Sequence, residues 1–219
     1  MKNLLLILVV LIYTSCGNQF DNGKSEKNTL EAFDLGCKDG GSCLPDHSCC
    51  IVGKDYNKLI VFDAFDFNNE VIGLQTEIIE AVLAFSECKN TDDMKKHCQK
   101  TLSVVQTSQE RLNMISCTKD YDNIFKNGAI KLFNFYEKMI DEDYSLLIGQ
   151  LEIINDEDLD DDTRQQAYDI MLEVNKNIST EEESIDEEFE IIQNKFARDN
   201  NFILEKNSDL QNKIDDLSN

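Results

Sequence analysis

Residues 69–85 read NEVIGLQTEIIEAVLAF, and the spacing of the apolar side chains in this stretch decides the fold class. The apolar side chains recur every three or four positions, which is the period of one face of an α-helix. Asn68 or Asn69 precedes them, and asparagine is favoured at a helix N-terminus. The stretch therefore predicts an amphipathic helix that begins at one of these asparagines. Its apolar face comprises Val71, Leu74, Ile78, Ile79, Val82 and Phe85.

The helical period continues after this stretch. Thr91-Asp92-Asp93 is expected to open a second helix, with negative charge at the positive end of its dipole, and Cys117 is expected to end it. Residues 124–140 form a third, strongly apolar helical segment, and residues 144–154 form a shorter one. Histidine 97 falls beside two lysines on the second helix, so we expect His97 on a solvated face.

The C-terminal part also has a helical pattern. Residues 167–174 continue as helix, and Thr180 with Glu183 has the spacing of a capping box, so we expect a long helix to begin there and run toward the C-terminus. Asp199 and Lys206 fall at core positions of its repeat, which favours packing on the chain's own bundle over a long coiled coil. The seven-residue repeat consists of Phe189, Phe196, Ile203, Leu210 and Leu217.

These patterns predict an all-α fold, a helical bundle with a small N-terminal cysteine module stapled by disulfides. The single proline, Pro45, fits a chain dominated by helices, because proline breaks them. The predicted division is a signal peptide over residues 1–16, a polar leader and cysteine module over 17–56, a helical domain with Cys88, Cys98 and Cys117 over 57–155, and acidic amphipathic helices over 156–219.

The N-terminus predicts export from the cytoplasm. Residues 4–12 are an unbroken apolar run that follows Lys2 and precedes small residues, as in a signal peptide, and the run is too short to span a bilayer. Residues 14–18, Thr-Ser-Cys-Gly-Asn, also resemble a bacterial lipobox, in which Cys16 would carry lipid and residues 17–29 would be a tether. Tyr13 departs from that pattern, which expects an aliphatic residue. We therefore expect a secreted protein, with a lipid-anchored bacterial surface protein as the alternative.

The charge of the chain restricts its partners. The formal net charge is -22, from 43 acidic and 21 basic residues, which excludes ordinary nucleic-acid binding because that needs basic groups facing phosphates. The same charge disfavours electrostatic attachment to anionic lipid and permits a cationic partner. The acidity is concentrated in residues 137–219, which have 25 acidic and 7 basic residues, against 18 and 14 in residues 1–136.

The cysteines predict disulfides. In an oxidising compartment most of the seven cysteines after Cys16 should pair, and the odd number permits a disulfide-linked dimer. Cys49 and Cys50 have Cα atoms about 3.8 Å apart, too close for an ordinary bond to each other. Cys98 and Cys117, if on one helix, lie about 28 Å apart and cannot pair. The disulfide candidates are Cys37, Cys43, Cys49, Cys50, Cys88, Cys98 and Cys117.

The spacing C-x5-C-x5-C-C in residues 37–50 resembles the opening of a granulin module. Only four of that family's cysteines are present, so the family's growth-factor role is not carried over. An alternative use of this loop is a zinc site, although the paired C-x2-C spacing of zinc knuckles is missing. Its four ligands would be Cys43, His47, Cys49 and Cys50.

Sites for catalysis and metal binding have weak signals. Asp46-His47-Ser48 contains the residue types of a hydrolase triad, but adjacent residues cannot converge as the triad requires, and we expect no enzyme activity and no cofactor. Residues 156–162 lack the glycine and the twelfth-position glutamate of an EF-hand, so only weak calcium binding is expected there. The calcium candidates are Asp156, Asp158, Asp160 and Asp162. Asn177 begins an N-glycosylation sequon, which is meaningful in a eukaryotic source.

Binding is the function that these features favour. The first hypothesis is a secreted effector or interaction protein, of the kind found among parasite or venom components, with a protein partner or extracellular ligand. The second is a bacterial surface lipoprotein, anchored through Cys16, that binds a host or matrix ligand. The third is an acidic, cation-responsive protein of secretory granules.

Overall fold

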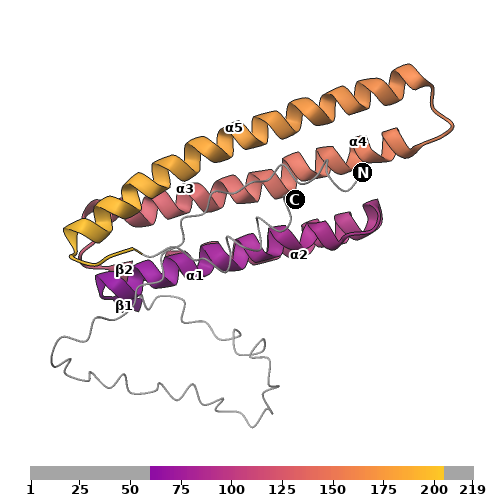
Figure 1. Cartoon of the computed structure of the whole chain (residues 1–219). Coiled ribbons are helices and arrows are strands. Elements are labelled where there is room, and N and C mark those ends of the chain that lie inside the picture. Colours follow the sequence, from indigo (N-terminus) through magenta and orange to yellow (C-terminus); the bar gives the residue numbers. More distant parts are fainter. Residues whose placement is uncertain (1–59, 205–219) are drawn as a thin grey trace, which may run out of the picture. The chain divides into compact units, whose positions relative to one another are not determined.

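The computed structural model describes residues 60–204, and helices account for most of them, which confirms the helical pattern of this part of the sequence (Figure 1). Within this range no helix is both long and apolar enough to cross a bilayer. The elements are β1 (Ile60–Phe62), α1 (Ala64–Leu83), η1 (Ala84–Glu87), α2 (Thr91–Met114), β2 (Ile115–Cys117), η2 (Tyr121–Asn123), α3 (Ile124–Lys138), η3 (Met139–Asp143), α4 (Tyr144–Asn155) and α5 (Asp161–Asp199).

The first helix begins earlier than the sequence predicted. Asp63 is its N-cap, and its carboxylate accepts a hydrogen bond from the backbone N–H of Asp66 at 2.9 Å. The apolar stripe extends back to Phe67, which is fully buried. Asn68 was expected as a cap, but it lies inside the helix and in the core, where its side-chain oxygen accepts a hydrogen bond from Gln193 at 3.0 Å. An asparagine with a buried partner was therefore mistaken for a cap.

The second helix begins at Thr91 as expected but ends at Met114, before Cys117. The chain then becomes extended, and β2 pairs in parallel with β1 in a two-stranded sheet that the sequence did not predict. Phe62 is opposite Cys117 in the register. Cys98 and Cys117 thus lie on different elements, so the condition that one helix contains both is not met. Three-residue strands are too short to show a period of two, so this pairing left no sequence pattern.

Helices α3 and α4 are joined without a loop. The five-residue π-helical turn η3 connects them, so the two helices follow one another in line (Figure 1). Helix α5 packs along both of them, while α1 packs against α2 and α2 against α3. Gly128 on α3 permits the approach of α5, since a Cβ there would lie 3.0 Å from the Ile192 side chain. These contacts place α5 and the preceding helices around one core.

The long C-terminal helix is continuous from Asp161 to Asp199. The new start predicted at Thr180 was wrong, because Thr180 lies in the helix interior and its hydroxyl donates to the Lys176 carbonyl at 2.9 Å. The buried stripe continues past this point through Ile178 and Phe189, so tertiary packing holds the helix together there.

This helix also ends before the C-terminus. Asn201 adopts a left-handed conformation with φ of 59°, and its N–H donates to the Arg198 carbonyl at 3.3 Å. The N–H of Phe202 donates to the Ala197 carbonyl at 3.1 Å, which completes a Schellman motif. Phe202 also packs edge-on against Phe196. The expected continuation through Ile203 is therefore wrong, because this motif closes the helix and Ile203 lies beyond it.

The core at one end of the bundle is aromatic. Phe125 stacks on Phe196 with ring centroids 4.7 Å apart, and on Phe189 at 5.6 Å. Phe67 packs edge-on against Phe125 at 5.8 Å. Helices α1, α3 and α5 thus meet through four phenylalanine rings, all of them buried.

Several expectations lie outside the described residues. They are the signal peptide, the polar leader, the lipidation candidate Cys16, the cysteine module with Cys37, Cys43, Cys49 and Cys50, the zinc alternative, and the repeat positions Leu210 and Leu217.

Candidate functional site

Two carboxyl groups lie on the side of α5 that faces the other helices, Glu182 buried and Asp186 partly buried. Glu182 and Asp186 lie one turn apart on α5, and Glu182 is only 4% exposed. Within residues 60–204 oxygen Oε1 of Glu182 has no hydrogen-bond partner. Desolvation of Glu182, followed by repulsion from Asp186, raises the pKa of its carboxyl to about 8. Desolvation alone raises the pKa of Asp186 to about 7.

Two tyrosines face these carboxyls from the neighbouring helices. Tyr136 on α3 is 1% exposed, its hydroxyl has no geometrically acceptable hydrogen-bond partner, and Gln75 on α1 lies beside it. Burial, and then the charges of Asp186 and Glu182, raise the pKa of Tyr136. Burial and then Glu182 likewise raise the pKa of Tyr144 on α4. We call these five side chains, Gln75, Tyr136, Tyr144, Glu182 and Asp186, the core carboxyl cluster.

The π-helical turn η3 separates the two tyrosines of the core carboxyl cluster. Eight residues of regular α-helix would leave Tyr144 about 80° around the axis from Tyr136. A π turn has more residues per revolution, so it rotates less per residue and removes part of that offset. Both tyrosines are buried as a result. Single π turns inside helices are frequent at functional sites. The position of η3 therefore makes the core carboxyl cluster a candidate site.

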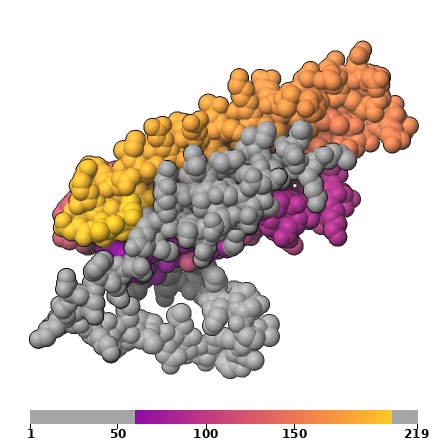
Figure 2. All heavy atoms as spheres, viewed as in Figure 1, coloured from indigo at the N-terminus to yellow at the C-terminus, as the bar shows by residue number. Residues whose placement is uncertain are grey.

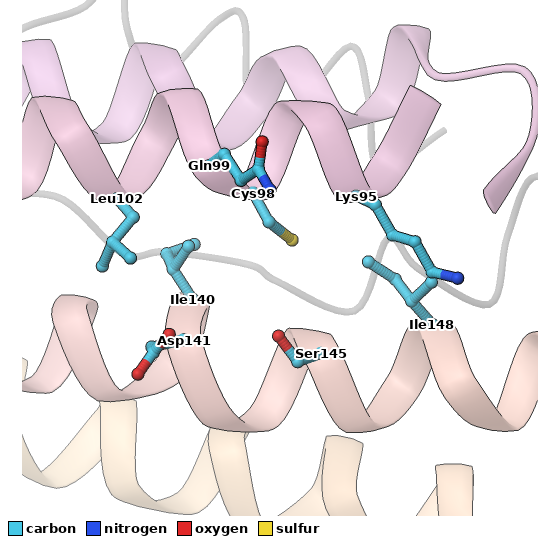
Figure 3. A pocket seen from close by; sticks show the side chains of 8 residues that line it. All are labelled: Lys95, Cys98, Gln99, Leu102, Ile140, Asp141, Ser145 and Ile148. Carbon is cyan, nitrogen blue, oxygen red and sulfur yellow. The ribbon is translucent and has the colours of Figure 1, made fainter. Parts of the chain in front are cut away.

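A groove with a volume of about 340 Å³ opens between α2 on one side and η3 and α4 on the other. Figure 3 shows the thiol of Cys98 pointing from α2 toward the space between the helices, with Ile140 and Ser145 on the opposite side. Burial, and to a lesser extent the nearby Cys88, raises the pKa of the Cys98 thiol to about 11. A thiol with that pKa is protonated at neutral pH, so it is a poor nucleophile.

Tyr144 of the core carboxyl cluster lies close to Cys98, which lines the groove. Tyr144 lies between Ile140 and Ser145 in the sequence, and its pKa responds to both Glu182 and Cys98. The side chain is 4% exposed and packs edge-on against Phe85, with ring centroids 4.9 Å apart. The Tyr144 ring is therefore enclosed in the core beside η1.

Cys88, Cys98 and Cys117, the three disulfide candidates within residues 60–204, are free thiols. Cys98 and Cys117 are buried and Cys88 is partly exposed. Lys119 donates its backbone N–H to the Cys117 sulfur at 3.3 Å. Pairing of any of these thiols with the cysteine module stays a prediction.

Histidine 97 is partly buried, whereas a solvated face was expected. Its ring nitrogen Nε2 lies 2.7 Å from the Ala81 carbonyl oxygen, and its ring packs edge-on against Phe85 with centroids 4.6 Å apart. The turn between α1 and α2 folds one helix back on the other, which covers this ring. His97 therefore joins the two helices.

The four calcium candidates lie around the turn between α4 and α5. Asp160 is the N-cap of α5, where its carboxylate accepts hydrogen bonds from the Thr163 backbone and hydroxyl at 2.8 and 3.0 Å. Asp156 accepts from the backbone of Asp158 at 3.0 Å, and Asp162 lies in the first turn of the helix. Two of the four carboxylates are thus engaged in local backbone contacts. Calcium binding here stays a prediction.

The glycosylation candidate Asn177 is exposed in the middle of α5. Within residues 60–204 no group of three or more histidine, cysteine or acidic side chains is arranged to hold a metal ion.

Glu182 and Asp186 were not singled out by the sequence analysis, because residues 181–190 contain seven acidic residues and composition does not distinguish these two from the others. A usable signal was present. Glu182 follows Ile178 by four residues and precedes Phe189 by seven, so it occupies a position of the buried stripe. An acid in an apolar stripe marks a buried polar group whatever the local charge.

No family model, no curated protein and no solved structure matches this chain.

Proposed function

We propose that this chain is a secreted helical protein that acts by binding, and that α5 presents its binding surface to a basic protein partner. The observation that carries this proposal is a row of unpaired carboxylates on α5. The helix has 12 acidic residues and 4 basic residues. A partner with a basic surface would gain electrostatic attraction along it, which raises association rates and favours the correct orientation.

The row lies on the face of α5 opposite its buried stripe, together with Lys176 and Arg198. We call it the acidic ridge; its members are Asp162, Asp169, Glu173, Glu183 and Glu187, all of them exposed. Within residues 60–204 no lysine or arginine nitrogen lies within 4 Å of any ridge carboxylate. In Figure 2 the outer surface of α5, orange to yellow, is visible along most of its length.

Other acidic residues of α5 are already used inside the bundle. Glu181 pairs with Lys138 on α3 at 2.6 Å, and Glu188 pairs with Lys131. Those pairs lie along the flank that contacts α3. This difference supports the proposal. Glu181 and Glu188 form ion pairs with α3, whereas the carboxylates of the acidic ridge form none within residues 60–204 and can interact with a partner.

Neutralising the acidic ridge should weaken binding to a cationic probe. We expect the triple variant Glu173→Gln, Glu183→Gln and Glu187→Gln to bind fluorescent oligolysine about tenfold more weakly than the wild type, since three exposed pairs at about 0.5 kcal/mol each are lost. Fluorescence anisotropy at low and near-physiological salt measures the affinity and its salt dependence.

A matched control separates the ridge from net charge. The variant Glu87→Gln, Asp92→Asn and Glu110→Gln removes the same charge from exposed positions on η1 and α2. It should weaken binding far less than the ridge variant. Equal losses in both variants would show that the ridge is not the binding surface.

Secretion is part of the proposal and rests on residues 4–12 and the small residues that follow. We expect the mature N-terminus to lie between Cys16 and Asn18, as intact-mass measurement on native material would show. An added diacyl or triacyl mass on Cys16 would select the lipid-anchored alternative. Retention of Met1 would contradict both forms of export.

A further inference from the structure

We propose that Glu182 and Asp186 form a proton-controlled latch that holds α5 on the bundle while they are protonated and loosens it when they ionise. The latch does not depend on the identity of any binding partner. It is built from the core carboxyl cluster, where α5 meets the two helices on either side of the π turn.

The position of the two carboxyls makes ionisation costly. Glu182 is 96% buried, and its Oε1 atom and the Tyr136 hydroxyl lack hydrogen-bond partners. A buried carboxylate oxygen that accepts no hydrogen bond loses its hydration without compensation, which favours the neutral, protonated form of Glu182.

Within residues 60–204 neither carboxyl forms an ion pair with a lysine or an arginine. From α1 the neutral Gln75 contacts the cluster, from α3 Tyr136, and from α4 Tyr144. From η3, Asp143 adds negative charge near Tyr144, and from α2 the Cys98 thiol adds to the same effect. The ammonium of Lys138 is engaged by Glu181, the residue before Glu182, at 2.6 Å, and Lys131 is engaged by Glu188. Protons are thus the available means of removing the buried charge.

The direction of the pH effect follows from the raised pKa values. Glu182 shifts from an ordinary value of 4.5 to about 8 and Asp186 from 3.8 to about 7. Between the unfolded and folded pKa values the folded chain binds more protons than the unfolded chain, so its stability falls as pH rises. The contribution is fully present below about pH 4 and is lost as pH rises through 7 and 8, the folded values. Mildly acidic pH therefore tightens α5 on the bundle, and alkaline pH loosens it.

The first test compares stability at two pH values. Urea unfolding of the full chain, followed by circular dichroism at about pH 6 and about pH 9, should show a lower midpoint at the higher pH. Over that range the folding equilibrium should change by about a hundredfold through Glu182 and by about tenfold through Asp186, because the effect of each group stops growing above its folded pKa. The double variant Glu182→Gln and Asp186→Asn should lose most of this pH dependence.

The matched control changes exposed acids of the same helix. Glu183→Gln with Glu187→Gln removes two charges from α5 without touching the core, and should retain the wild-type pH dependence. A double variant that depends on pH as strongly as the wild type would overturn the latch. So would restoration of stability at about pH 9 by millimolar calcium or magnesium, which would identify a cation site instead.

A second measurement does not require a folded variant. Carboxyl ¹³C resonances of the wild-type chain should include two that titrate near pH 7 and 8, against the bulk of the acids near 4. Amide hydrogen exchange, corrected for its intrinsic pH dependence, should then show protection of α5 falling over the same range more than that of α2. Carboxyls that all titrate below about pH 5.5 would contradict the proposal.

Discussion

Replacing Phe125 with alanine is expected to lower the free energy of unfolding by about 3–5 kcal/mol. Phe125 is fully buried and contacts three other rings, Phe67, Phe189 and Phe196. Its removal would leave a cavity where α1, α3 and α5 meet, and stacked rings have little freedom to collapse into it. Urea unfolding followed by circular dichroism measures the loss.

The adjacent residue provides the control for Phe125. Ile124 is 47% exposed at the start of α3, so Ile124→Ala should change the free energy of unfolding by less than about 1 kcal/mol. Comparable losses at both positions would mean that the aromatic contacts do not stabilise the bundle as the structure indicates.

Replacing Asp120 with alanine is expected to cost about 2–3 kcal/mol. Asp120 is 7% exposed, and its two carboxylate oxygens each accept a hydrogen bond at 2.9 Å, from the backbone N–H groups of Phe125 and Lys126. Those N–H groups belong to the first turn of α3 and have no partner inside the helix. Left-handed backbone at Asp122 and Asn123, with φ of 57° and 53°, accompanies the turn that brings the carboxylate to them.

Two comparisons test this role of Asp120. Asp120→Asn keeps one oxygen acceptor and should lose about half as much stability as the alanine variant. Asp92→Ala removes an exposed acid from the first turn of α2 and should cost only a few tenths of a kcal/mol. If Asp120→Ala were no worse than Asp92→Ala, the carboxylate would act only through the helix dipole. Thermal or urea unfolding measures all three.

The sequence was a good guide to most helices because their hydrogen bonds are local. Thr91 was expected to open a helix and does so at the first residue of α2, since Asn90 caps the turn through the backbone N–H of Asp93 at 2.8 Å. The segment expected at 144–154 corresponds to α4, Tyr144–Asn155. In both cases the period of the apolar residues and the capping residues lie within a few positions of the helix that they specify.

The errors arose where distant residues decide the outcome. Thr180 has the spacing of a cap, but packing of Ile178 and Phe189 on the other helices keeps α5 continuous there. The β1–β2 pairing joins Ile60 to Ile115, whose contact no local pattern reveals. Asn68 became a core residue because Gln193, far along the chain, lies opposite it.

The amino-acid sequence by itself determined a mostly helical chain, its uneven charge and the acidic composition of its last helix, because helical period and net charge are properties of short segments. Only the tertiary structure decided which acids are charged at the surface and which are enclosed. Glu182 and Glu183 are neighbours in the sequence, yet one is buried and the other is exposed. Successive residues of a helix point about 100° apart, so the two side chains lie on different faces of α5. The carboxyl on the face that packs against α1, α3 and α4 is the one that is desolvated.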